Sequence, residues 1–401
     1  MITDYIKFAF ETFMQRRKRT ILTLLGIFIG IAAIVSLISL GQGLEKSVTE
    51  IFEQLGSDKI IMTPGVGSAL AIPGSTGKFT DDDLKVIKRT RGIDLVAPMV
   101  SKLAQVKFGD QTLYSWVSGV PTDEGFEVFE SMATFSIPQG RKLRNQDKYK
   151  TVIGIRLNEA DYYDKEVLLR DSLVIEGQKF KVVGVMSRIG NPEDDSQLLI
   201  PLDTAQELFN EDGYVAIMAQ VLTKDVAGVS ERVKKNLRRH RNVKEGEEDF
   251  SVQTSEELME SFDTILTVVQ AVLIGIAAIS LFVGGIGIMN TMYTSVLQRT
   301  RIIGIMKAVG AKDSDILWIF VIESGILGLF GGVVGIAVGM GISKVVEMGA
   351  HQAGITFFKV FFPVELIAGA LLFSFLVGVL SGISPAIRAS KLKTVDVLRY
   401  E

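Results

Sequence analysis

The chain has 401 residues, of which 47% are hydrophobic and 22% charged, so its apolar residues must be concentrated in segments. It contains no cysteine, which excludes disulfides, thiolate metal sites and a cysteine nucleophile. Its two histidines, His240 and His351, are too far apart in sequence for the helical histidine pair of a zinc protease. The net charge of −3 becomes informative only when it is divided among the segments of the chain.

Four segments are apolar and long enough to cross a bilayer, which takes about 20 residues. The first follows the basic cluster Arg16–Arg19, and we interpret it as an uncleaved span because its apolar run exceeds the roughly 7 to 15 residues of a signal peptide. The third is interrupted by one charge, Glu323. The predicted spans are residues 20–44, 264–291, 316–343 and 366–387.

The orientation of the spans follows from the basic residues in their short flanks, which stay on the cytoplasmic side. Residues 1–19, 292–315 and 388–401 together hold thirteen Lys and Arg, whereas the 344–365 loop holds two. We therefore expect a multi-pass protein of the cytoplasmic membrane with both termini in the cytoplasm, and residues 45–263 and 344–365 outside. Within residues 1–19, Ile6, Phe10 and Phe13 have helical spacing, which predicts an amphipathic helix in the membrane interface or a cytosolic extension of the first span.

Residues 45–263 have a mixed pattern that predicts a large extracytoplasmic α/β domain. Strands are expected at 59–62 and 249–253, a hairpin at 173–185, and amphipathic helices after Thr80 and over Val226–Leu237. A β-rich insertion of about 110–210 separates the two ends of this domain. The fold class is thus an α-helical membrane protein with four transmembrane helices plus this domain.

We find no catalytic, cofactor-binding or metal-binding constellation in the sequence. Gly74–Lys78 lacks the glycine spacing of a phosphate loop, so we expect no ATPase activity and no bound ATP or Mg²⁺ in this chain. The acidic run Glu193–Asp195 follows Asn-Pro, which favours a solvated turn over a calcium site.

The loop between the second and third spans carries an apolar stripe at i, i+3, i+4 and i+7, formed by Ile302, Ile305, Met306 and Val309. Gly304 lies off this stripe, and Gly310 is placed to end the helix. Three basic residues flank it, Arg299, Arg301 and Lys307. Such a helix fits a groove in a partner protein, or alternatively the surface of an anionic membrane.

The third span has glycines at small-x-x-x-small spacing, which allows helices to approach closely, at Gly328, Gly331, Gly332, Gly335 and Gly339. They can serve packing within one chain or a dimer seam, and we favour the first. Glu323 should face protein or water, because a carboxylate facing lipid is costly. We expect a structural or switching role for it.

The stretch Gln298–Ala311, followed by Asp315-Ile, Glu323 and Gly331-Gly332, resembles the macrolide-exporter (MacB/FtsX-type) ABC transporter permease family. The segments beginning Arg17-Lys-Arg-Thr and Pro385-Ala-Ile-Arg are similar to the family's terminal motifs, and Val182-Val-Gly-Val and Ile200-Pro-Leu-Asp resemble its periplasmic core domain. The resemblance covers nearly the whole chain.

This resemblance implies a permease that works as a homodimer, or as half of a heterodimer, with a separate cytosolic ATPase that binds ATP and Mg²⁺. It also allows for an extracytoplasmic adaptor, and no nucleic acid is implied. The family often has acidic residues at the positions of Gln298 and Ile302, so ionic contacts to the ATPase at these positions are in doubt here. The residues assigned to coupling are Gln298, Arg299, Arg301, Ile302, Gly304, Ile305, Met306, Lys307, Val309 and Gly310.

Three functions remain as hypotheses. The first is a permease that transmits ATPase movement to the outer domain for export or mechanotransmission. The second is an FtsX-like switch acting on an external partner such as a cell-wall hydrolase. The third is a receptor that signals inward, which the lack of a cytosolic signalling domain disfavours.

Overall fold

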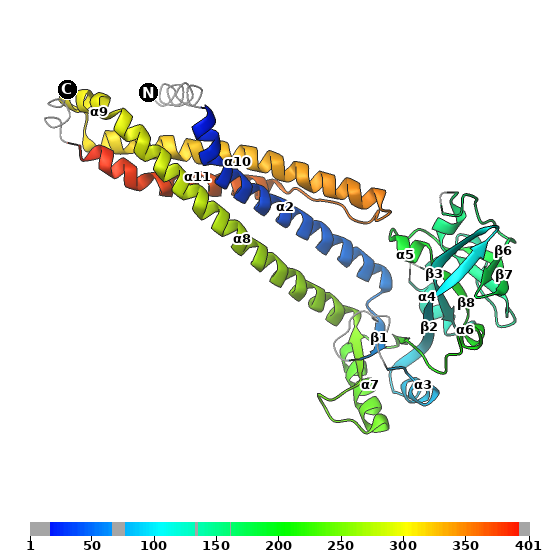
Figure 1. The fold of residues 1–401 in the computed structure, drawn as a ribbon. Helices are drawn as coiled ribbons and strands as arrows, with labels where there is room; N and C mark the ends of the chain where they lie inside the picture. Colours follow the sequence, from blue (N-terminus) through cyan, green and yellow to red (C-terminus); the bar gives the residue numbers. More distant parts are fainter. Residues whose placement is uncertain (1–16, 66–76, 133–134, 161, 393–401) are drawn as a thin grey trace. The chain divides into compact units, whose positions relative to one another are not determined.

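The computed structural model describes all residues except 1–16, 66–76, 133–134, 161 and 393–401. The amphipathic helix predicted within residues 1–19 and most of the 388–401 tail therefore lie outside the described part of the chain. The described chain forms two units (Figure 1). One unit is helical, and the other is an α/β unit formed by 45–265 with the short segment 350–358.

The helical unit contains four helices long and apolar enough to cross a membrane, as predicted. At about 1.5 Å per residue, a helix of 40 residues is about 60 Å long, twice the roughly 30 Å of a bilayer core. The first three helices therefore continue well beyond the predicted spans. The helices are α2 (Arg17–Leu55), α8 (Ser255–Gln298), α10 (Asp313–Gln352) and α11 (Val364–Ser390), with the short α9 (Thr300–Ala308) between α8 and α10.

Glycines determine where these helices touch. A Cβ added at Gly328 would lie 2.3 Å from the Ser374 carbonyl oxygen on α11, and one at Gly335 would lie 2.8 Å from Ile31 Cβ on α2. Gly332 contacts α11 and Gly339 contacts α2 in the same manner, and Gly331 is buried. The small-residue series of α10 therefore packs α10 against two neighbouring helices of the same chain.

The α/β unit is built on a β-α-β-β-α-β motif in which all neighbouring strands are antiparallel. The spatial order is β10-β1-β9-β2. Apolar side chains of both helices, including Ile87 and Val233, pack in one core with Ile60 and Val252 of the sheet. The elements are β1 (Lys59–Pro64), α3 (Asp81–Lys88), β2 (Ile93–Phe108), β9 (Ala216–Val221), α7 (Val226–Arg241) and β10 (Phe250–Thr254).

Helix α3 begins where the sequence predicts. Thr80 caps α3 by accepting a hydrogen bond from the Asp83 backbone N–H, and the Asp83 side chain accepts one from the Thr80 N–H in return. Arg241 near the end of α7 donates two hydrogen bonds to the buried Asp83, at 3.0 and 2.7 Å. This ion pair fastens the end of α7 to the start of α3.

A β-rich insertion lies between β2 and β9. Strand β2 has 16 residues and belongs to both the motif and the insertion, because its first half pairs with β9 and its second half with β3. The predicted hairpin is β6–β7, and its turn residues Glu176 and Gly177 both have positive φ, as a tight hairpin turn requires. The elements are β3 (Gln111–Val120), α4 (Phe126–Glu130), β4 (Gln139–Gly140), β5 (Lys150–Ile153), η2 (Ile155–Asn158), β6 (Ser172–Ile175), β7 (Gln178–Val185), α5 (Pro192–Asp195), β8 (Leu198–Pro201) and α6 (Leu202–Phe209).

Two long helices run directly into neighbouring strands of the sheet. Helix α2 leads into β1 after three residues, β10 leads into α8 without a gap, and β1 and β10 are paired. The Ser255 hydroxyl donates a hydrogen bond of 3.0 Å to the Gly56 carbonyl, and the Phe52 and Phe262 rings lie 5.9 Å apart. The ends of both helices are thus joined at the edge of the sheet.

The link between α10 and α11 belongs in part to the α/β unit. The Thr356 N–H donates a 2.8 Å hydrogen bond to the carbonyl of Gly190 in the insertion. The Ser47 hydroxyl of α2 donates one of 3.0 Å to the Phe357 carbonyl. This link therefore connects the insertion to the C-terminal part of α2.

Candidate functional site

The strongest candidate site is α9, the nine-residue helix in the loop predicted to bind a partner. The first part of this loop differs from the prediction, because residues 292–298 continue α8. Helix α9 ends at Ala308, and Gly310, which follows the C-cap residue Val309, has a φ of +109° that favours glycine. The Ala311 N–H closes the last turn by donating to the Met306 carbonyl at 3.0 Å. Gly310 thus ends the helix at the position that the sequence indicates.

Helix α9 presents an apolar stripe to the outside of the helical unit. The side chains of Ile302, Ile305 and Val309 are 50%, 49% and 85% exposed, although large apolar side chains normally avoid water. Met306, which the sequence pattern places on the same stripe, is half-buried and packs against the core of the helical unit together with the fully buried Ile303. The exposed stripe is therefore narrower than predicted.

Two of the three basic residues expected to flank the stripe point into the helical unit instead. Arg299 pairs with Glu323 of α10 at 3.1 Å, and both side chains are mostly buried. Lys307 donates hydrogen bonds to the main-chain carbonyls of Ser390 and Leu392, at 2.5 and 2.9 Å. Of the three, Arg301 is the exposed one.

Two further predicted coupling residues also differ in burial. Gly304 is buried on the inner face of α9, whereas Gln298 is exposed at the end of α8. The structure adds a further contact that was not predicted from the sequence, a cation–π contact between Arg388 of α11 and Tyr293 of α8 at 4.7 Å. No signal in the sequence identifies this pair, because a basic residue after a span is also expected from the orientation of that span in the membrane.

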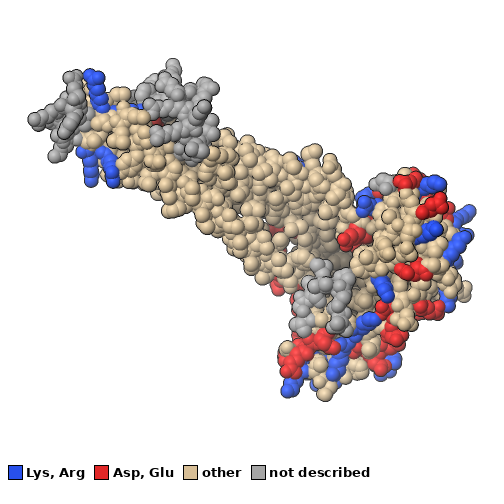
Figure 2. All heavy atoms as spheres, viewed as in Figure 1, with Lys and Arg blue, Asp and Glu red and all other residues tan. Residues whose placement is uncertain are grey.

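The surface of the helical unit separates charge from apolar residues. In Figure 2, the middle of the helices shows no charged side chain on the visible face, and Lys and Arg gather at the end that carries α9. This is the distribution expected of a membrane-embedded bundle whose basic end borders the aqueous phase.

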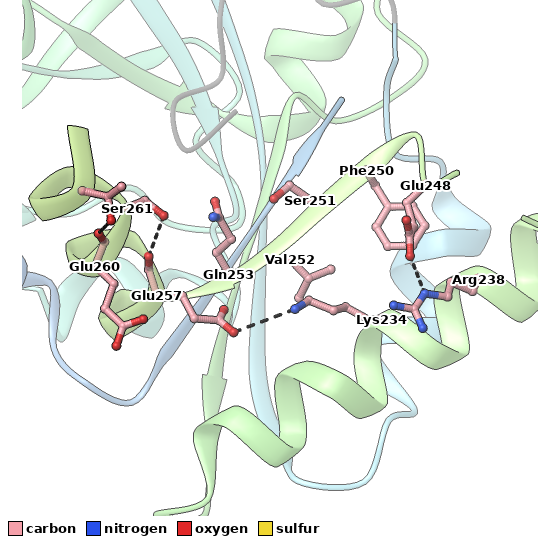
Figure 3. Close-up of a pocket in the computed structure, with 11 residues that line it drawn as sticks. Lys234, Arg238, Glu248, Phe250, Ser251, Val252, Gln253, Glu257, Glu260 and Ser261 are labelled. Atoms are coloured by element: carbon pink, nitrogen blue, oxygen red, sulfur yellow. Dashed lines mark hydrogen bonds and ion pairs between the residues drawn. The ribbon is translucent and has the colours of Figure 1, made fainter. Parts of the chain in front are cut away.

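A second candidate is a cavity of roughly 530 Å³ in the α/β unit, between α7, β10 and the start of α8 (Figure 3). Both basic side chains that line it face an acidic one, since Lys234 lies 3.8 Å from Glu257 and Arg238 Nε lies 2.6 Å from Glu248. No arrangement of nucleophile, base and oxyanion donor occurs among the described residues that line it. Across the described chain, no three His, Asp or Glu side chains are grouped as ligands for a metal ion.

Two solved structures, one of a periplasmic region and one of an extracellular domain, have some likeness to part of the chain. The periplasmic region of MacB from Actinobacillus actinomycetemcomitans covers 54% of this chain, with 97% of that structure matched, at a TM-score of 0.44 and 16% identity. The extracellular domain of the transporter YknZ covers 49% of this chain and is matched over its whole length, at a TM-score of 0.39 and 16% identity.

Similar sequences include proteins of similar length. An uncharacterized ABC transporter permease of Methanocaldococcus jannaschii is 39% identical over 100% of this chain and 98% of its own. The uncharacterized ABC transporter permease YknZ of Bacillus subtilis is 29% identical over the full length of both. The macrolide export ATP-binding/permease protein MacB of Bdellovibrio bacteriovorus is 30% identical over 99% of this chain, which spans 62% of that longer protein.

Two family models match the chain. The MacB-like periplasmic core domain matches residues 20–236, and the FtsX-like permease C-terminal region matches residues 274–394. These matches lie on the α/β unit with its preceding helix and on the later helices, respectively. The chain therefore belongs to the MacB/FtsX-type family of ABC transporter permeases.

Proposed function

We propose that this permease couples ATP hydrolysis by a separate cytosolic ATPase to motion of its α/β domain on the other side of the membrane, for export or mechanotransmission. In this proposal the chain holds neither ATP nor Mg²⁺, which the ATPase binds. It works as a dimer with a second copy or a related permease, and an extracytoplasmic adaptor is a further partner. The observation that carries the proposal is the exposed stripe of Ile302, Ile305 and Val309 at the basic end of the helical unit.

A route for the motion is supported by chain continuity. A helix displaced along its axis moves both of its ends, because its hydrogen-bonded backbone is stiff. Helices α2 and α8 lead into the paired strands β1 and β10, so a shift of either helix acts directly on the sheet edge. No pore for a solute is needed in this mechanism, because the work is done on the α/β domain.

A second candidate function is an FtsX-like switch acting on an external partner such as a cell-wall hydrolase. It uses the same route and differs in what the α/β domain contacts. The observation that favours this candidate is the cavity in the α/β unit, where Glu257 and Glu248 already engage the two basic side chains, Lys234 and Arg238, that could bind an anionic solute.

The experiment is co-purification of the permease with co-expressed ABC ATPase subunits from the same genome. Replacing Ile305 with Asp buries an unpaired charge in a docking groove, which costs several kcal/mol of association. We expect at least a hundredfold weaker capture, since each tenfold step corresponds to about 1.4 kcal/mol. Ser314→Asp adds the same charge at an exposed position just outside α9 and serves as the matched control.

The alternative, in which α9 lies on anionic lipid, gives the opposite result. Arg301→Glu then weakens membrane-surface contact by about 1 kcal/mol per basic residue, while ATPase capture is unaffected by either variant. Under the docking proposal, Arg301→Glu changes mainly the salt dependence of association, so capture is measured at two salt concentrations. Undiminished capture by Ile305→Asp contradicts docking through α9.

A further inference from the structure

Helix α9 is fastened to the helical unit at both of its ends. At the N-terminal end, Arg299 Nη1 lies 3.1 Å from Glu323 Oε2, and the two side chains are only 15% and 14% exposed. At the other end, Lys307 is 10% exposed and reaches the carbonyls of Ser390 and Leu392 at the end of α11. Lys307 also pairs with Asp313 at the start of α10, at 2.7 Å.

These contacts matter because α9 has little stability of its own. Nine residues make about two and a half turns, and isolated helices shorter than about 12 to 15 residues are marginal. Its N-cap residue, Arg299, makes no side-chain capping hydrogen bond. The orientation of α9 must therefore come from its contacts with other helices.

The two contacts use different physical interactions. Glu323 is the eleventh residue of α10, about 15 Å along the helix, and it pairs with the guanidinium of Arg299. Removing one partner of such a pair leaves a buried charge uncompensated. Lys307 instead supplies donors to carbonyls at the end of α11, where a helix leaves acceptors without partners and its dipole favours a positive charge.

We propose that Arg299 and Lys307 are positioning residues that lock α9 to α10 and α11, so that a push on α9 is delivered to the third and fourth spanning helices. Between the two contacts, the fully buried Ile303 packs the inner face of α9 against the core of the helical unit, so the exposed stripe faces outward. The inference rests on the proposed function, in that the push comes from the ATPase. The locked geometry itself is a property of the permease alone and is tested without the ATPase.

The test measures a distance between two spin labels in the full-length protein in lipid nanodiscs. Because the chain has no cysteine, Ala308→Cys on α9 and Leu380→Cys on α11 give unique labelling sites, and both positions are exposed. Labelled protein is diluted into excess unlabelled protein, so that distances between the two subunits of a dimer do not contribute. With both contacts intact, we then expect one narrow distance distribution. Adding Glu323→Gln removes the charge that holds Arg299, so the distribution should broaden or shift by several Å.

Arg301→Gln is the matched control, because it removes one positive charge from an exposed position in the same helix, and its distribution should match the parent. Exchanging the two residues in one chain, with Arg299→Glu and Glu323→Arg together, should restore the narrow distribution. If Glu323→Gln acted only by disturbing the local packing, this exchange would not restore it. Lys307→Gln tests the second contact independently and leaves no buried charge behind. The proposal is overturned if Glu323→Gln and Lys307→Gln both leave the distribution unchanged, or if the swap fails to restore it.

ATPase capture then separates this inference from the proposed function. If α9 docks on the ATPase, Ile305→Asp abolishes capture and leaves the label distances unchanged, while Glu323→Gln changes the distances. Unchanged capture with Ile305→Asp, together with altered distances in Glu323→Gln, refutes docking and supports the locked geometry. The two ideas therefore fail through different measurements.

Discussion

At the scale of single residues, Asp147 of the insertion shows how a buried charge is kept ionised. Its side chain is 4% exposed and accepts hydrogen bonds from the Arg141 guanidinium at 2.5 and 3.1 Å and from the Arg144 backbone N–H at 3.0 Å. Lys150 also pairs with it. Burial opposes ionisation, but these donors and the nearby positive charges outweigh it and lower the pKa of Asp147 to about 2.

This lowered pKa predicts a stability contribution with a defined pH window. In the unfolded chain the pKa of an Asp is about 3.9, so the contribution is fully present above about pH 4 and is lost as pH falls toward 2. Replacing Asp147 with Asn removes this charge and should lower the free energy of unfolding at pH 7. We expect a loss of only roughly 1 to 2 kcal/mol, because Arg141 is partly solvated and water screens its charge.

Thermal unfolding of the detergent-solubilised protein between pH 7 and pH 3 measures this stability contribution. The gap in Tm between the two proteins should narrow below pH 4, whereas a gap that does not change with pH contradicts the assignment. Asp110→Asn in an exposed turn is the control.

At the scale of helices and strands, packing follows from the smallest residues. Gly328 of α10 sits so close to α11 that an added Cβ would also approach Gly378 Cα to 2.9 Å. In lipid, helix association depends on such close packing, because the hydrophobic effect does not favour one apolar contact over another.

Gly328→Leu should therefore separate α10 from α11, with a cost at or above the roughly 1 to 3 kcal/mol typical of overpacking. We expect a Tm lower by several degrees and a loss of the monodisperse peak in size-exclusion chromatography. Gly341→Leu is the matched control, because Gly341 is an exposed glycine of the same helix with no atom within 4 Å of an added Cβ. Equal behaviour of the two variants contradicts the assigned packing.

At the scale of the whole molecule, the distribution of charge predicts the orientation in the membrane. Thirteen basic residues lie in the segments expected inside, against two in the 344–365 loop expected outside. Asp110→Cys in the α/β domain should then react with a membrane-impermeant thiol reagent in intact cells. Ser314→Cys at the start of α10 should react only after lysis, since both positions are exposed in the structure. The reverse pattern of labelling means that the orientation is inverted.

Much of the architecture was predictable from the sequence because it depends on residue patterns within short segments. Charge-free runs of 20 or more residues predict spanning helices wherever they occur, and alternation around Glu176-Gly177 predicts a hairpin without knowledge of its neighbours. The stop at Gly310 is a backbone property of the residue itself. The paired strands β1 and β10 were also expected, although their pairing with each other was not.

The roles of the charged residues in and around α9 depended on contacts between distant segments. In the sequence, Arg299, Arg301 and Lys307 look alike, since each is a basic residue beside an apolar stripe. Their different roles arise because Glu323 lies 24 positions after Arg299, and the end of α11 lies more than 80 positions after Lys307. Helical periodicity describes which residues share a face, but it does not say which face another helix covers. That face was decided by packing in three dimensions, which buried Ile303 and half of Met306 and left Ile302, Ile305 and Val309 exposed.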